Sequence, residues 1–74
     1  MEVADMSDTA QQKVGLEYAA GNPEVLMLKE AAARLITLIE ETQQAHPSAA
    51  REAALAITHV QTASFFAVFA ATAP

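Results

Sequence analysis

The Gly-Asn-Pro-Glu segment at residues 21–24 constrains the fold most strongly, because it contains consecutive helix-start signals. The side chain of Asn22 can accept a hydrogen bond from a free backbone N–H in the first helical turn. Pro23 suits the first helical position, where an N–H has no partner to lose. Pro47 restricts the backbone of the residue before it and ends the helical pattern. We therefore expect a helix over residues 23–45.

The residues around this helix complete an all-α prediction. Residues 46–48 form the next turn, and Ser48 is placed to cap a second long helix. A turn this short makes the two helices antiparallel neighbours. We expect one helical domain over residues 1–74, with a short N-terminal segment or helix followed by a long antiparallel helical hairpin. The remaining segments are then a loose arm or short helix (1–12), an ordered lead-in (13–22) and the second hairpin helix (49–72).

The first hairpin helix has an apolar side and a solvated side. Its apolar residues recur at alternating spacings of three and four, which is typical of a helix packed along one seam. The predicted seam is Val25, Leu28, Ala32, Leu35 and Ile39, widened by Ile36 and Leu38. The residues expected on the solvated side are Glu30, Arg34, Thr37, Glu40, Glu41 and Gln44.

The second hairpin helix has more apolar surface than one partner helix can cover. One face is small (Ala53, Ala56, Val60, Ala63, Ala67, Ala70), and another carries Leu55, Thr58, Thr62, Phe65, Phe66 and Phe69. Residues 63–71 are apolar nearly all round, which is typical of a helix buried on every side. The chain has 74 residues and no cysteine, so neither a large core nor a disulfide can stabilise it. We therefore expect a homo-oligomer.

Charge and composition exclude several classes of partner. The formal net charge is −5, which argues against binding duplex DNA or RNA, because phosphate neutralisation needs clustered Lys and Arg. No basic region precedes an apolar run, so a secretory signal is not expected. Residues 53–73 are long enough to span a bilayer, but they include several polar side chains and rely on alanine, a weak driver of insertion. We expect no membrane association.

The chemistry-bearing residues do not form a catalytic pattern. His46 and His59 lie on a turn and a helix without a paired-carboxylate or HExxH motif. The chain has no cysteine nucleophile, no glycine-framed serine and no phosphate-binding glycine loop. We expect neither enzymatic activity nor a metal or cofactor. His59 on its own is most simply a helix-packing histidine.

Two residues allow both a structural and a functional interpretation. Lys29 stands among apolar neighbours, so it is either a surface lysine lying over them or an anion contact in a mostly apolar site. Tyr18 is either a core aromatic with a solvated hydroxyl or a platform on which a base can stack. Periodicity alone does not choose between these alternatives.

Three stretches of the chain resemble a known family. These are YAAGNPEVLMLK (residues 18–29), LITLIEE (35–41) and AITHVQTASFFAV (56–68). Together they resemble the small phage anti-CBASS cyclic-oligonucleotide sponges, phage proteins that sequester the signalling nucleotides of bacterial CBASS immunity. The resemblance covers about residues 14–74, and its most specific parts are GNPEV and THVQTAS.

The resemblance implies a function, an assembly and a site. It implies a non-enzymatic homohexamer in the cytoplasm of the infected bacterial host, with cyclic dinucleotides held at subunit interfaces. Tyr18 matches the aromatic that covers a base, and Lys29 matches the lysine on a phosphate. Thr58 and His59 match the Thr-His pair of the family. The chain departs from the family at Phe69, where members often carry Lys or Arg at a separate site for cyclic trinucleotides, so that second site stays open.

A different class of function also fits the residues. The chain could be a small helical phage adaptor that binds a host protein through its apolar C-terminal helix. The sponge requires Tyr18 and Lys29 to converge, whereas the adaptor requires an exposed apolar surface.

Overall fold

The structure is a computed structural model that describes residues 6–19 and 21–74. Its α-helices are α1 (Asp8–Val14), α2 (Pro23–Ala45) and α3 (Ala50–Thr72). Two short 3₁₀ helices connect them, η1 (Leu16–Ala19) and η2 (Pro47–Ala49). No strand occurs in the described residues. The prediction of an all-α chain with a long helical hairpin is confirmed.

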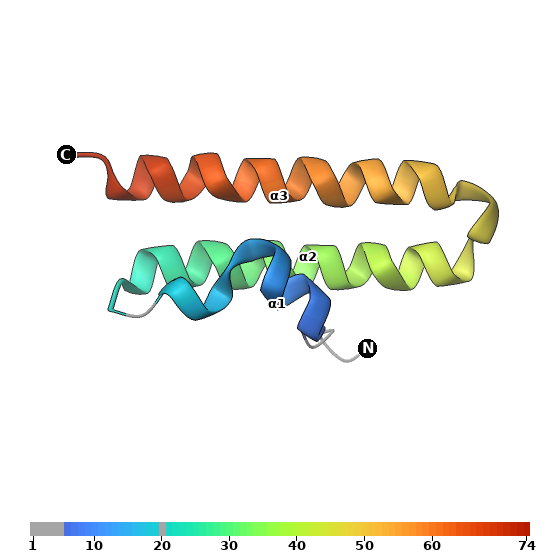
Figure 1. Ribbon diagram of the computed structural model, residues 1–74, viewed down its shortest axis with the longest axis horizontal. Helices are drawn as coiled ribbons and strands as arrows, with labels where there is room; N and C mark the ends of the chain where they lie inside the picture. The colour runs from blue at the N-terminus through green and yellow to red at the C-terminus, as the bar shows by residue number, and fades with distance from the viewer. Residues whose placement is uncertain (1–5, 20) are drawn as a thin grey trace.

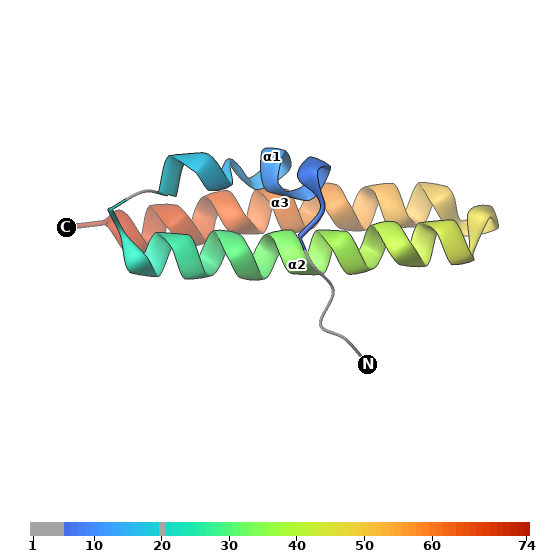
Figure 2. The ribbon, with the colours of Figure 1, turned by 90° about the horizontal axis from the view of Figure 1, so that it is seen from below.

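The hairpin sets the shape of the molecule. Figure 1 shows α2 and α3 running antiparallel along its length and joined at η2. The molecule measures 44 × 24 × 18 Å. The segment formed by α1 and η1, hereafter the N-terminal strap (residues 7–19), lies along one side of the hairpin and contacts both long helices (Figure 2). The C-terminus and the start of α2 therefore lie at the same end of the molecule.

The start of α2 follows from local sequence. The side-chain oxygen of Asn22 accepts a hydrogen bond from the backbone N–H of Val25 at 3.1 Å, and Pro23 occupies the first turn. At the other end, the N–H of His46 donates to the carbonyl of Thr42 at 2.9 Å. The predicted Asn22 cap is confirmed.

The start of α3 differs from the prediction. Ser48 does not cap this helix: the N-cap is Ala49, without a side-chain hydrogen bond. Pro47 instead begins the 3₁₀ turn η2, in which the N–H of Ala49 donates to the carbonyl of His46 at 2.9 Å. Ser48 lies inside this turn and is exposed, so its hydroxyl is not at the cap position.

The boundary expected between residues 12 and 13, where the N-terminal segment would give way to the lead-in, lies inside α1. Of the two alternatives for residues 1–12, the described part from Asp8 onward is a helix, whereas residues 1–5 lie outside the described residues. This helix continues through Val14 and ends at Gly15, whose φ of 64° is in the left-handed region that favours glycine. The N–H of Gly15 donates to the carbonyl of Gln12 at 3.1 Å.

The core lies where the strap meets the hairpin. As a result, the buried face of α2 differs from the predicted seam. Its buried members are Ala10, Val14, Ala33, Ile36 and Ile57. Leu35, expected in the seam, is 47% exposed, whereas Thr37, expected on the solvated side, is 7% exposed. The cause is the strap, because it covers the side of α2 on which Thr37 lies: the N–H of Ser7 donates to the hydroxyl of Thr37 at 2.9 Å.

Candidate functional site

Polar side chains of α2 fix the beginning of the strap. Both carboxylate oxygens of Glu40 accept hydrogen bonds, one from the hydroxyl of Ser7 and one from that of Thr9. The hydroxyl of Thr37 accepts from the N–H of Ser7 and donates to the carbonyl of Ala33 at 2.8 Å. The start of α1 is therefore held by a charged and a neutral acceptor from the same helix.

The end of α1 is held by one side chain from each long helix. The amide nitrogen of Gln61 on α3 donates to the carbonyl of Lys13 at 3.0 Å. The ammonium of Lys29 on α2 donates to the carbonyl of Gly15 at 2.9 Å. Carbonyls at a helix end lack helical partners, and a cation there is favoured by the helix dipole. Both contacts therefore satisfy groups that α1 cannot satisfy alone.

Lys29 is buried, so the surface-lysine interpretation is wrong. Its side chain is 9% exposed, and the apolar stem passes between α2 and the strap to reach Gly15. The ammonium has further N–H donors beyond the one that Gly15 accepts. A buried cation with donors left over can still bind an anion that approaches from outside the strap.

Tyr18 is exposed, so the core-aromatic interpretation is also wrong. Its side chain is 78% exposed, and its backbone N–H donates to the carbonyl of Gly15 at 3.0 Å. One carbonyl thus accepts hydrogen bonds from both Tyr18 and Lys29. The two side chains also face one small space: a Cβ on Gly15 would lie 3.3 Å from the Tyr18 ring and 3.6 Å from the Lys29 ammonium nitrogen.

Gly15 is the residue that sequence reasoning missed. In the sequence, Gly15 only interrupts the expected lead-in at residues 13–22, and nothing there connects it to Lys29. Lys29 lies 14 positions further along the chain, on a different helix. The pairing depends on how the strap folds back on α2, which no local pattern encodes.

Thr58 and His59 lie elsewhere. Both are exposed on α3, and the hydroxyl of Thr58 donates to the carbonyl of Ala54 in its own helix at 3.1 Å. They follow the buried Ile57, so they are rotated by about 100° and about 200° from the face that packs on α2. Within one subunit, the structure does not bring this pair together with Tyr18 and Lys29.

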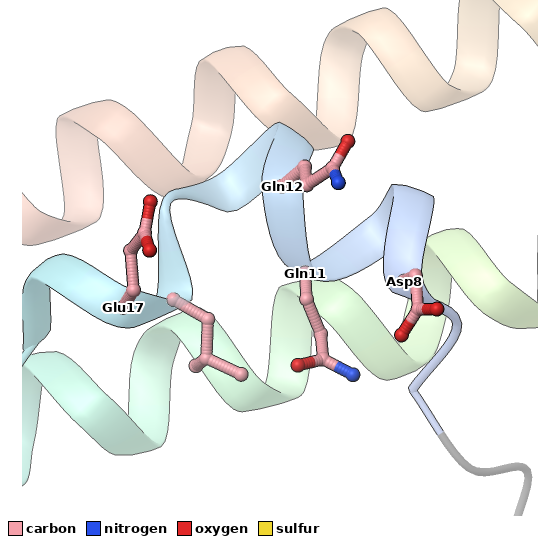
Figure 3. Close-up of a pocket in the computed structure, with 5 residues that line it drawn as sticks. Asp8, Gln11, Gln12 and Glu17 are labelled. Atoms are coloured by element: carbon pink, nitrogen blue, oxygen red, sulfur yellow. The ribbon is translucent and has the colours of Figure 1, made fainter.

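A cavity beside the strap does not fit an anion. Its volume is about 390 Å³, and its lining residues, shown in Figure 3, are Asp8, Gln11, Gln12, Leu16 and Glu17. The carboxylates of Asp8 and Glu17 would repel a phosphodiester. The cavity adjoins the Tyr18 segment in sequence, but Tyr18 and Lys29 are not among these residues.

The comparison with known families decides which family the chain belongs to. The model of the Acb2/Tad1 hairpin domain matches residues 9–72 of the chain. The chain belongs to this family. The Acb2/Tad1 family is the family of anti-CBASS sponges, so the resemblance of the three stretches is confirmed.

Membership in the Acb2/Tad1 family gives a general function. Its hairpin domain is of a sequestering type, it is not known for catalysis, and its members' ligands are cyclic oligonucleotide signals. A search of the curated proteins and a search of the solved structures gave no match. Within the part of the chain that the structure describes, no group of three His, Cys, Asp or Glu side chains could hold a metal ion.

The outward side of α3 is unusually apolar. We define the aromatic face as Leu55, Phe65, Phe66 and Phe69, all of which are exposed. By length and composition alone, the segment Pro47–Thr72 could also cross a membrane, although such a segment is weak evidence for a span. Clustered exposed apolar side chains of this kind are typical of surfaces that contact a partner or a membrane.

Proposed function

We propose that this Acb2/Tad1 hairpin protein sequesters cyclic dinucleotides without degrading them, in the cytoplasm of the infected bacterium. Tyr18 stacks on a base, and Lys29 donates to a phosphate. Base stacking on an aromatic side chain contributes about 1–3 kcal/mol, and a hydrogen bond to a charged group about 1.5–3 kcal/mol. Capture of these signals would prevent them from reaching the effectors of CBASS immunity.

One observation carries the proposal. The carbonyl of Gly15 accepts from the backbone of Tyr18 and from the ammonium of Lys29, so the residue that carries an exposed ring and a buried cation share one acceptor. The Tyr18 ring is free to receive a base, because its side chain is 78% exposed. A base and its neighbouring phosphate are the groups that this pair is suited to bind.

The acidic net charge of −5 opposes the binding of a doubly charged ligand, and assembly supplies the compensation. At a two-fold interface, each ligand meets Tyr18 and Lys29 from two subunits. Charges in a partly desolvated pocket interact far more strongly than the same charges in water. We therefore place the complete site between subunits, and Thr58 and His59 contribute to it from a neighbouring subunit.

The aromatic face supports assembly. Phe65, Phe66 and Phe69 are exposed over successive turns of α3, and α2 leaves Met27 and Leu35 exposed as well. We propose that copies of the chain cover these surfaces in a homohexamer and that the chain is associated with neither membranes nor DNA or RNA. Because the Phe69 ring cannot pair with a phosphate, the proposal does not include a second site for cyclic trinucleotides.

The same aromatic face favours a second candidate function, a phage adaptor that binds a host protein. Both candidates use the exposed side of α3, but only the sponge uses Tyr18 and Lys29. An adaptor would keep full partner binding after Tyr18→Ala and would not respond to nucleotides.

Calorimetric titration with a panel of cyclic dinucleotides tests the proposal. We expect tight binding of at least one of them, followed by recovery of the intact cyclic compound when the complex is denatured by heat. A linear product would show that the protein is an enzyme. No heat of binding from any cyclic dinucleotide would overturn the sponge in favour of the adaptor.

A further inference from the structure

We propose that Gly15 is the positioning residue of the Tyr18–Lys29 site. Its carbonyl holds the Lys29 ammonium and the Tyr18 backbone, and its lack of a side chain leaves room for the Tyr18 ring beside the cation, before the ligand arrives. This inference rests on the proposed function, and it adds a residue that touches neither base nor phosphate.

The Gly15 carbonyl accepts two hydrogen bonds. A carbonyl oxygen has two lone pairs, and here the Tyr18 N–H occupies one at 3.0 Å and the Lys29 ammonium the other at 2.9 Å. Lys29 is a long side chain whose immobilisation on binding costs free energy. The Gly15 carbonyl and the burial of Lys29 already fix the ammonium. The free energy needed to immobilise this side chain is therefore spent when the protein folds and not when the ligand binds.

Gly15 has no side chain, and the place where one would stand lies beside the Tyr18 ring and the Lys29 nitrogen. A Cβ at this position would lie 3.3 Å from the Tyr18 ring, which is tighter than ordinary contact, and 3.6 Å from the Lys29 nitrogen. The ring would have to give by a few tenths of an ångström to make room. Any side chain at position 15 therefore disturbs the spacing between the two binding groups, whatever its polarity.

The segment that contains Gly15 is itself anchored to the hairpin. Its N–H donates to Gln12 at 3.1 Å, and the carbonyl of Lys13 accepts from the amide of Gln61 at 3.0 Å. These contacts tie the end of α1 to α3, while the Lys29 contact ties it to α2. The carbonyl that accepts from the Tyr18 backbone and from the Lys29 ammonium is therefore tied to both helices of the hairpin.

The chain offers a matched control for this role. Gly21 also has a positive φ, 85° against 64° for Gly15, but nothing among the described residues lies within 4 Å of a Cβ built there. Asparagine tolerates the left-handed region better than other side chains do. Gly15→Asn and Gly21→Asn thus place the same residue at similar backbone angles, and only the first crowds the Tyr18 ring.

The experiment measures ligand affinity and the state of Tyr18 in wild type and both variants. The chain has one tyrosine and no tryptophan, so the anisotropy of its intrinsic emission reports on Tyr18 alone. We expect Gly15→Asn to weaken cyclic dinucleotide binding by about tenfold relative to Gly21→Asn, as expected when side chains must be ordered on binding. We also expect a lower Tyr18 anisotropy in ligand-free Gly15→Asn only, with helix content and assembly unchanged.

The outcomes separate the two proposals. If wild type binds and the two variants have equal affinity and equal Tyr18 anisotropy, Gly15 has no positioning role and the inference is overturned alone. If wild type binds no cyclic dinucleotide, the proposed function fails and the inference fails with it. Loss of affinity in Gly15→Asn together with loss of helix content would instead show a role in folding, and it too would contradict the inference.

Discussion

The N-terminal strap and the aromatic face of α3 differ in the contacts that their side chains make within one chain. The strap is docked by polar contacts that all lie within one subunit, from Glu40 and Thr37 at its start to Gln61 and Lys29 at its end. The aromatic face leaves Phe66 71% exposed and Phe69 77% exposed. The contacts of the strap are made within a single chain, whereas the proposed assembly would cover the aromatic face with a second copy.

This difference shows how a short chain can divide two tasks. Directional hydrogen bonds fix the strap and the groups attached to it, Tyr18 and Lys29, in one arrangement. Non-directional apolar surface on α3 is suited to hold copies together. Substitutions confined to one region at a time can therefore separate the two roles.

The aromatic face is tested by Phe66→Asp combined with Phe69→Asp. Burying one such side chain contributes about 1.5–3 kcal/mol, and each substitution recurs in every subunit. We expect the assembly to dissociate into 7.8 kDa monomers in sedimentation velocity. Gln44→Asp, an exposed position on α2, adds charge away from this face and should leave the assembly intact. A double variant that sediments like wild type would contradict the proposed role of the face.

The proposed binding groups, Tyr18 on the strap and Lys29 on α2, are tested by Tyr18→Ala and Lys29→Met. Each group acts twice per ligand at a two-fold interface, so we expect each variant to weaken cyclic dinucleotide binding by roughly a hundredfold. Tyr18→Phe keeps the ring and should bind nearly as well as wild type. Arg51→Ala, near the start of α3, should matter much less. Calorimetric titration at a protein concentration that preserves the assembly provides the measurement.

Two results for Tyr18→Ala and Lys29→Met would contradict the proposed site. Unchanged affinity in both Tyr18→Ala and Lys29→Met would move the site away from the strap. A loss in Arg51→Ala as large as in Lys29→Met would show a general charge effect rather than a local site.

The docking of the strap is tested by Glu40→Gln. The amide keeps one acceptor oxygen but loses the charge that strengthens the bonds from Ser7 and Thr9. We expect the free energy of unfolding to fall by about 1 kcal/mol in urea denaturation at fixed protein concentration. Glu41→Gln, exposed one position further on, is the matched control and should have little effect. Equal effects of the two variants would show that the strap does not depend on Glu40.

An effect of similar size and opposite sign is expected at Ser64. Its side chain is 4% exposed on α3, and its hydroxyl has no hydrogen-bond partner among the described residues. Burying an unsatisfied hydroxyl costs free energy, so Ser64→Ala should raise the free energy of unfolding by about 1 kcal/mol. Thr62→Ala, exposed one half-turn away, serves as the control. Destabilisation by Ser64→Ala would show that the hydroxyl has a partner in the assembled protein.

Local signals explain which parts of the fold were predictable. The start of α2 depends on Asn22 and Pro23 themselves, so the sequence contains the whole cause. Ser48 has the right residue type for a cap, but the 3₁₀ turn begun by Pro47 moves the start of α3 past it. A residue's preference fails as a predictor when a neighbouring residue imposes a different backbone path.

The site was predictable only in part, because its contacts are not local. Tyr18 and Lys29 could be selected from their chemistry and from the family resemblance, and their ligand roles stay predictions. That Gly15 joins them could not be foreseen, since the helix-ending glycine and the lysine meet only after the strap folds back on α2. Thr37 shows the same effect: its burial comes from the strap and not from the periodicity of its own helix.

Native mass spectrometry of the wild-type chain, with and without cyclic dinucleotides, tests the central claim most directly, because it reports assembly and ligand together. We expect a hexamer without ligand, and with ligand the same hexamer carrying the unaltered mass of intact cyclic dinucleotide. A monomer that gains no mass with any cyclic dinucleotide, or a complex that releases a linear product, would contradict the claim that this protein is an assembled, non-enzymatic sponge.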